Sequence, residues 1–408
     1  MSPSADFVAA ALRSTTVIEP PSLRPASPSG WSDTSVTAGP GLNSRAGSDP
    51  SRAKPERIGY IDMARGLFLI LMTSTHAMTL AGLGSTSFLA RWGLPRGWAT
   101  TGLIMLCGFM VATFVRQMEE RSRIRQRALR RAKELLLVMF ASNAVMVGIR
   151  HWVTHETEPL FSLEWWSGVL FLGSEWSISA ILFPIGLFLI VSPALVALYD
   201  GCRSQLQQVM FAGGVFLCVA FAWSVPSLFP DSLAHYRVLD VMFGARPGGF
   251  PVIPMIGSGA LGFLLGVFWQ PSQKRFSLIT TLGAILFFLV ARLLLSATPQ
   301  SFGAVIGRTF LDISHLVLII ALAIGLAHWR PSQRALRFIP LLGRYSLFAF
   351  LIHRVVEQTL AIELRPYGFP SEVVYVVCFG GGLMGLVELL KWRPMFPSYD
   401  RFLRALYL

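Results

Sequence analysis

The sequence predicts an all-α fold: a polytopic integral membrane helix bundle with about ten transmembrane helices and both termini in the cytoplasm. Three observations lead to this prediction, namely composition, the lengths of the apolar segments and the placement of positive charge. Hydrophobic residues make up 53% of the 408 positions and charged residues only 14%, whereas a soluble globular chain is about a quarter charged. Most of the chain is therefore expected to lie in lipid.

The apolar segments have the length that a membrane span requires. A helix needs about 20 mainly apolar residues to cross the hydrocarbon of a bilayer. Ten segments meet this criterion, and we predict spans at residues 60–82, 97–115, 134–152, 177–198, 209–226, 251–270, 278–296, 310–329, 342–361 and 371–391. Segment 163–174 is too short to cross and rich in Trp, so we expect an interfacial or re-entrant piece there.

Positive charge is distributed as expected for a membrane protein of this topology. With the N-terminus in the cytoplasm, the cytoplasmic segments carry 21 Lys and Arg, against seven on the opposite face. Cytoplasmic loops are normally the more positive ones, which supports ten spans. The same clustering accounts for the net charge of +13, so nucleic acid is not an expected partner. The basic stretch 116–133 is expected to contact anionic membrane lipids, and attraction of acyl-CoA phosphates is a secondary alternative.

The ends of the chain differ from its centre. Residues 1–55 contain eight Pro and eleven Ser without a periodic apolar pattern, so we predict a disordered cytoplasmic tail. A membrane domain is expected at 56–395, followed by a short cytoplasmic tail at 396–408. The four cysteines, Cys107, Cys202, Cys218 and Cys378, have no paired spacing, which predicts neither a disulfide framework nor a metal site.

The first predicted span carries three ionisable residues, Asp62, Arg65 and His76. Arg65 and His76 are eleven residues apart, which places them about 20° from a common helix face and about 16 Å apart along the axis. Asp62, three residues before Arg65, is placed to pair with it. Ionisable residues inside a membrane are functional-site candidates. Two structural alternatives stay open: Arg65 reaching toward the headgroups, and His76 hydrogen-bonded to a neighbouring helix.

This arrangement suits one kind of chemistry. An arginine near the cytoplasmic end binds phosphate through paired, charge-assisted hydrogen bonds. A neutral imidazole deeper in the membrane, with an ordinary pKa of about 6.5, accepts the proton of a hydroxyl that attacks a thioester. The Arg65–His76 spacing is comparable to the pantetheine arm of acyl-CoA. We therefore predict acyl-CoA as a co-substrate and no permanently bound cofactor.

Four stretches resemble a known family. The run "RIGYIDMARGLFLILMTSTHAM" (57–78), with an Arg, ten residues and a His, is similar to the first span of the acyltransferase-3 superfamily, and most similar to its OpgC-type branch of periplasmic glucan succinyltransferases. The other three are "LIMLCGFMVA" (103–112), "FPVIPMIGSGALGFLLG" (250–266) and "LGRYSLFAFLIH" (342–353). Cys107 stands where the family usually has Ser. The likeness covers about residues 57–391.

The resemblance implies a membrane-bound O-acyltransferase that moves a succinyl or acetyl group from acyl-CoA to a hydroxyl of a periplasmic or cell-surface glycan. It implies a multi-pass protein of the bacterial inner membrane. By position, Arg65 and Asp62 would serve the donor and His76 would be the catalytic base. The glycan acceptor and membrane lipids are expected partners, and proteins of glucan synthesis are candidate partners. A transporter or flippase for a glycan or lipid-linked sugar, and a non-catalytic scaffold, remain alternatives.

Further candidate residues lie outside the first span. Glu175 is a second catalytic candidate, because a carboxylate near His76 would raise its basicity; the alternative is a solvated interfacial Glu. His235, Arg237 and Asp240 lie in the long loop 232–251 and are candidates for binding sugar, or else form a solvated cap.

The ninth predicted span carries another group of polar residues. His353, Arg354 and Glu357 are candidates for substrate binding. Glu357, four residues after His353, is placed to orient it, and the alternative is a buried ion network that holds helices together. Asp312 and His315, which open the eighth predicted span, are expected to be structural.

Overall fold

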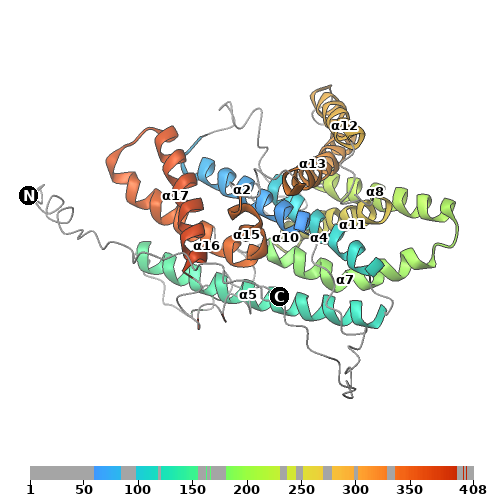
Figure 1. Ribbon diagram of the computed structural model, residues 1–408, viewed down its shortest axis with the longest axis horizontal. Helices are drawn as coiled ribbons and strands as arrows, with labels where there is room; N and C mark the ends of the chain where they lie inside the picture. The colour runs from blue at the N-terminus through green and yellow to red at the C-terminus, as the bar shows by residue number, and fades with distance from the viewer. Residues whose placement is uncertain are drawn as a thin grey trace, which may run out of the picture. The chain divides into compact units, whose positions relative to one another are not determined.

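The computed structural model describes residues 59–83, 98–117, 121–154, 181–229, 237–244, 251–269, 278–297, 302–328 and 336–392, together with a few isolated positions. Within these residues the regular elements are twelve α-helices and one short 3-10 helix (Figure 1). The predicted class, an all-helical polytopic membrane protein, is confirmed. The tail at 1–55 and most of segment 163–174 lie outside the described residues.

The helices follow the predicted spans closely. Nine predicted spans correspond to one helix each, and the tenth to a bent pair. The elements are α2 (Gly59–Leu80), α4 (Trp98–Gln117), α5 (Arg121–Thr154), α7 (Leu182–Gly201), α8 (Gln205–Leu228), α10 (Arg237–Phe243), α11 (Val252–Phe268), α12 (Leu278–Ala297), α13 (Phe302–His328), α15 (Phe338–Arg344), α16 (Ser346–Leu364), η2 (Arg365–Tyr367) and α17 (Ser371–Lys391).

Not every helix is apolar enough to be recognised as a span by itself. Among the described residues, four helices pass a test of length and hydropathy, in α7, α8, α13 and α17, and a fifth is added if α15 and α16 form one span. The apolar helices Ala99–Val115 and Val252–Phe268 are shorter. The multi-pass character is therefore clear, while the number ten and the cytoplasmic termini stay predictions.

The largest differences from the sequence prediction concern α5 and the ninth span. α5 begins at Arg121 rather than at 134, so the basic stretch continues the predicted third span as one helix of 34 residues. Such a helix is about 50 Å long, longer than the hydrocarbon is thick, and its first turns expose Arg123, Arg125 and Arg127. The ninth span is not one straight helix, because α15 and α16 meet at an angle of 103°.

α2 lies at the centre of the helices that carry polar residues. It packs against α4, α13, α15, α16 and α17 (Figure 1), and 13 of its 22 residues are buried. Two glycines make its contact with α15 close: a Cβ at Gly66 would collide with the carbonyl of Ile339, and one at Gly343 with the carbonyl of Asp62. α15 therefore lies directly on the turn that carries Asp62 and Arg65.

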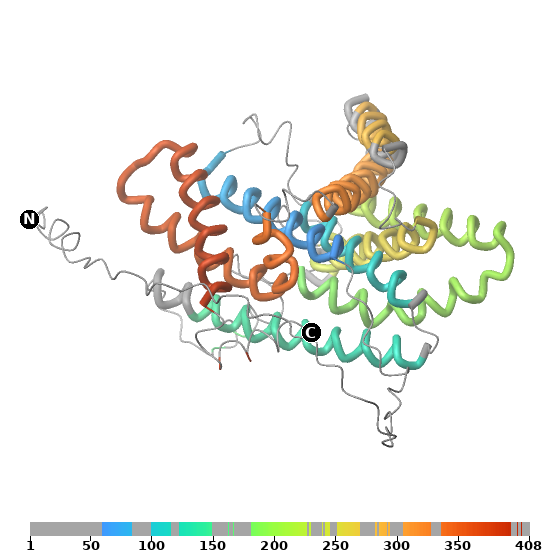
Figure 2. The backbone as a smooth tube through the Cα atoms, in the orientation of Figure 1, coloured from blue at the N-terminus to red at the C-terminus, as the bar shows by residue number. Residues whose placement is uncertain are grey.

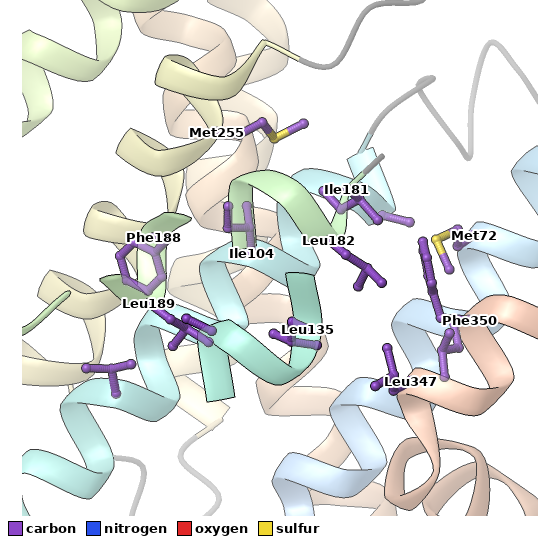
Figure 3. Packing of buried hydrophobic residues seen from close by; sticks show 14 of the residues in the cluster. Met72, Ile104, Leu135, Ile181, Leu182, Phe188, Leu189, Met255, Leu347 and Phe350 are labelled. Carbon is purple, nitrogen blue, oxygen red and sulfur yellow. The ribbon is translucent and has the colours of Figure 1, made fainter. Parts of the chain in front are cut away.

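Glycines also bring the backbones of α4 and α11 into close contact. A Cβ at Gly108 would collide with the carbonyl of Gly259, and a Cβ at Gly262 with the carbonyl of Met105. Small residues that bring helix backbones together are typical of membrane proteins. Around this contact a continuous apolar core joins α4, α5, α7 and α11, as Figure 3 shows for Ile104, Leu135, Phe188 and Met255.

A tight hairpin brings the last helix back onto the bundle (Figure 2). α16 ends at Leu364, η2 makes one turn, and Gly368 adopts a left-handed conformation with φ of 63°. Glycine is favoured there because it lacks the Cβ that makes this region costly for other residues. After the turn α17 packs against both α16 and α2, so α2, α16 and α17 surround one polar cluster.

Candidate active site

Two histidines from distant parts of the chain meet between α2 and α16. The ring centroids of His76 and His353 are 5.4 Å apart, with the ring planes tilted by 33°. His76 is half-buried, and His353 is only 1% exposed. The predicted catalytic base and one of the predicted substrate-binding residues are therefore neighbours.

The orientation of the His353 ring is set by its own helix. Its Nδ1 lies 3.0 Å from the carbonyl oxygen of Ala349, one turn earlier. Because a carbonyl oxygen only accepts hydrogen bonds, Nδ1 carries a proton and donates it to this bond. Nε2 is buried and has no hydrogen-bond partner among the described residues. In the neutral imidazole this nitrogen holds an unused lone pair.

The carboxyl group of Glu357 is buried between three helices. Glu357 is 0% exposed, and neither of its carboxyl oxygens makes a hydrogen bond within the described part of the chain. A Cβ built at Gly382 of α17 would lie 3.1 Å from the Glu357 Cγ and 3.5 Å from the Thr73 Cγ2, so both side chains border Gly382. The expected orientation of His353 by Glu357 is therefore wrong: the Ala349 carbonyl has that role.

Arg354 directly follows His353 in α16. Its Nη1 is buried and makes no hydrogen bond to the described residues, and it lies within electrostatic range of His76 and Glu357. Since the oxygens of Glu357 and the Nη1 of Arg354 are all without hydrogen bonds in the described part of the chain, the alternative of a tightly paired ion network is not realised here.

α17 contributes two contacts that the sequence did not indicate. The hydroxyl groups of Ser74 and Tyr375 are 2.9 Å apart, and the Cys378 thiol donates to the backbone carbonyl of Glu357 at 3.7 Å. Both contacts tie α17 to the helices that carry the histidines. Tyr375 and Cys378 stand in an apolar run without a recognisable motif, so a sequence pattern gives no signal for them.

Arg65 lies at the other polar region of α2. Its Nη1 is 3.9 Å from the Asp62 Oδ1, so the expected contact is present at long range. Its Nη2 donates to the Met110 sulfur of α4 at 2.8 Å, and the side chain remains 28% exposed. The guanidinium group is therefore directed toward α4 and stays accessible.

A second arginine, Arg131, acts electrostatically on the same cysteine thiol as Arg65. The Cys107 thiol of α4 is within electrostatic range of both Arg65 and Arg131. Arg131, from α5, is 27% exposed and contacts Glu134 at 3.4 Å. Two partly exposed guanidinium groups from different helices thus both act electrostatically on one thiol of α4. Arg131 belongs to the basic stretch 116–133, for which attraction of acyl-CoA phosphates is the alternative to a role at the lipid surface.

Several predicted site residues fall outside what the structure describes. Glu175 and His235 lie outside the described residues, and for Arg237 and Asp240 only the backbone, in α10, is described. Their proposed roles stay predictions. Among the described residues there is no group of three His, Cys, Asp or Glu side chains that would hold a metal ion.

Asp312 and His315 belong to a different part of the bundle. The His315 ring lies 5.1 Å from Phe288 of α12, and Arg308 lies 4.8 Å above the Trp223 ring of α8. Aromatic contacts of this kind stabilise helix packing. The ring contact of His315 joins α13 to α12, and the structural role expected of Asp312 and His315 stays a prediction.

The comparison with protein families decides the class of this protein. The family model described as an acyltransferase domain (Acyl_transf_3) matches residues 58–391. The chain belongs to the acyltransferase-3 family. It is a multi-pass membrane acyltransferase, and the match supports the enzyme over the alternatives of a transporter or a scaffold. The search of curated proteins found no significant match, and the search of solved structures found none either.

Proposed function

We propose that this acyltransferase moves an acyl group from acyl-CoA, bound from the cytoplasmic side, to a hydroxyl of a periplasmic or cell-surface glycan. The observation that carries the proposal is the arrangement on α2, where Arg65 and His76 lie eleven residues apart near a common face. The corresponding rise of about 16 Å suits a donor with phosphates at one end and a thioester at the other.

The phosphate end of the donor is assigned to Arg65 and Arg131. Both are partly exposed, from α2 and α5 respectively, and both lie in range of Cys107. Guanidinium groups bind phosphate oxygens through paired hydrogen bonds. The exposed Arg123, Arg125 and Arg127 of α5 add a positive field that attracts a polyanion. Asp62 limits the rotation of the Arg65 side chain from one turn away.

The thioester end is assigned to the surroundings of His76. The acceptor hydroxyl attacks the thioester carbonyl while His76 takes its proton, and the C–S bond breaks as the tetrahedral intermediate collapses. His76 then returns the proton to the departing thiolate, which leaves as the free thiol of CoA. General acid–base catalysis of this kind typically contributes about 10²- to 10⁴-fold.

The acyl group is assigned as succinyl rather than acetyl. Arg354 follows His353 directly in α16, lies within electrostatic range of His76, and has a buried Nη1 without a hydrogen bond in the described part of the chain. A terminal carboxylate on the acyl group would satisfy this guanidinium group, and a methyl group would leave it unsatisfied. A donor that carries a second carboxylate is therefore favoured.

The acceptor is assigned to the face opposite the donor. His235, Arg237 and Asp240 lie in the long connection before α11 and combine charged and aromatic neighbours suited to sugar hydroxyls. A glycan acceptor on this face fits a bacterial inner membrane enzyme that works together with glucan synthesis.

The proposal is tested with the full-length protein purified into proteoliposomes. Labelled succinyl-CoA and acetyl-CoA are supplied with a β-glucan oligosaccharide, and ester formation is followed by mass spectrometry. We expect succinyl transfer that exceeds acetyl transfer and that disappears in His76→Ala, while the matched variant His315→Gln keeps the wild-type rate. Absence of ester from either donor in the wild type, or an unchanged rate in His76→Ala, would contradict the proposal.

A further inference from the structure

The contact between His76 and His353 bears on which nitrogen of His76 can act as the base. A histidine acts as a base through one nitrogen only, and which nitrogen is available depends on the hydrogen bond that the other makes. The proton of a neutral His76 ring can sit on either nitrogen, so a hydrogen-bond partner is needed to decide which nitrogen keeps the lone pair that acts as the base. Catalytic bases are therefore commonly oriented by a third group.

His353 has the features that such an orienting group needs. Its Nδ1–H is committed to the Ala349 carbonyl at 3.0 Å, so Nε2 is the acceptor nitrogen in the neutral ring. This nitrogen is buried, has no hydrogen-bond partner in the described part of the chain, and belongs to a ring whose centroid is 5.4 Å from that of His76. A buried acceptor without a partner is destabilising, and a hydrogen bond from an N–H of His76 would satisfy it.

The other polar groups around the pair do not offer this contact. Arg354 is a donor and not an acceptor. The Glu357 carboxyl lies one turn further along α16 beside Gly382, the Tyr375 hydroxyl is bonded to Ser74, and the Cys378 thiol to the Glu357 carbonyl. Of these groups, His353 is therefore the one that combines a ring contact to His76 with an unused acceptor.

We infer that His353 is a positioning residue for the transfer reaction: its Nε2 accepts a hydrogen bond from one N–H of His76, which leaves the other nitrogen of His76 free to take the proton of the acceptor hydroxyl. The hydrogen bonds then run in one direction, from hydroxyl to His76, to His353, to the Ala349 carbonyl. Catalytic hydrogen bonds often tighten only when substrate binds, and in this structure the two rings are in contact, with centroids 5.4 Å apart. The inference rests on the proposed role of His76.

One proton is transferred in this reaction, from the acceptor hydroxyl to the sulfur of CoA by way of His76. The proton of the hydroxyl moves to His76 as the new ester bond forms, and it moves from His76 to the sulfur as the thioester bond breaks. The hydrogen bond to His353 stabilises the imidazolium formed between these two events, because hydrogen bonds of charged donors are the stronger ones. His353 itself neither gains nor loses a proton.

Two substitutions separate this role from simple packing. The amide of His353→Asn reaches the place of Nδ1 and keeps the Ala349 bond, but it leaves no acceptor at the place of Nε2. The longer side chain of His353→Gln brings an amide oxygen close to the place of Nε2. We expect kcat to fall about 10- to 100-fold in His353→Asn, with the KM for the donor within about threefold, and to recover by about tenfold in His353→Gln. A structural role predicts no such recovery.

The measurement uses the proteoliposome assay with thermal melting of each variant, and His315→Gln is the matched control for loss of another buried histidine. A kcat in His353→Asn within twofold of the wild type overturns the inference, as does an equal loss in the Asn and Gln variants. If the Asn variant does not fold, the Gln variant decides alone: a folded Gln variant as inactive as His76→Ala overturns it. An inactive wild type instead contradicts the proposed function itself.

Discussion

α2 and α8 are helices of similar length that are built for opposite surroundings. α2 buries 13 of its 22 residues among five other helices and carries Asp62, Arg65 and His76. In α8, only 28% of the most apolar window is buried, and large side chains such as Val209, Leu217 and Phe221 are exposed. α2 is therefore surrounded by other helices, whereas the apolar side chains of α8 face outward, as expected for a helix in contact with lipid.

Hydropathy alone does not select the helices that carry most of the candidate site residues. The helices that pass as spans by composition include α7 and α8, whose outward faces supply contact with lipid. α2 and the bent pair α15 and α16 are harder to recognise because they carry ionisable residues. Charged residues are costly in a membrane unless protein surrounds them, and the burial of α2 provides that surrounding.

The largest effect is expected at the catalytic end of α2. Replacement of His76 by Gln removes the base while keeping a polar side chain of similar size. We expect kcat to fall about 10²- to 10⁴-fold with unchanged thermal stability, measured as succinyl transfer in proteoliposomes. Retention of more than a tenth of the wild-type kcat would show that the polar helix is not the catalytic one.

The next effect is expected at the donor end of the same helix. Arg65→Gln removes a charge-assisted contact worth about 1.5–3 kcal/mol, so the KM for acyl-CoA should rise about 10- to 100-fold while kcat changes little. Arg308→Gln removes a cation that lies over Trp223 in another part of the bundle and is the matched control. Equal KM values for the two variants would argue against a phosphate contact at Arg65.

A smaller effect is expected where α15 crosses α2. Gly343→Ala forces a methyl group against the Asp62 carbonyl, and overpacking of this kind costs about 1–3 kcal/mol. Gly283→Ala in α12, where a Cβ would meet nothing within 4 Å, should leave stability unchanged. The test is the thermal melting of both variants in detergent, and an equal melting temperature would mean that the close helix contact is not needed.

The smallest effect is expected at the contact between α2 and α17. Ser74→Ala removes the hydrogen bond to the Tyr375 hydroxyl, and a net loss of about 1 kcal/mol follows. The reciprocal variant Tyr375→Phe should lose a similar amount, and the double variant should lose little more than either alone. Strictly additive losses would show that the two hydroxyl groups do not stabilise each other.

Much of the fold was predictable because the length of each apolar segment and the charge of each loop can be read from the sequence one segment at a time. A run of apolar residues long enough to cross a bilayer forms a helix whatever its neighbours are, and each predicted span indeed falls on a helix or on the bent pair. The break at Tyr345 was not predictable, since residues 342–361 read as one apolar run. It depends on Gly66 and Gly343, which allow α15 to lie across α2.

The candidate site was predictable only along single helices. The facing of Arg65 and His76 and the contact of Asp62 with Arg65 follow from helix periodicity. The meeting of His76 with His353, the bond of His353 to Ala349, and the placement of Arg131 near Cys107 depend on how helices pack. Spacing within one helix carries no information about which neighbour it meets.

In the proposed reaction, Arg65 and His76 act at two ends of one donor molecule. The most direct test compares succinyl-CoA with succinyl-pantetheine, which keeps the thioester but lacks the nucleotide phosphates. With the truncated donor, the loss of kcat/KM in Arg65→Gln should disappear, while the loss in His76→Gln should persist. If Arg65→Gln were impaired equally with both donors, or if His76→Gln turned over either donor at the wild-type rate, the central claim would be contradicted.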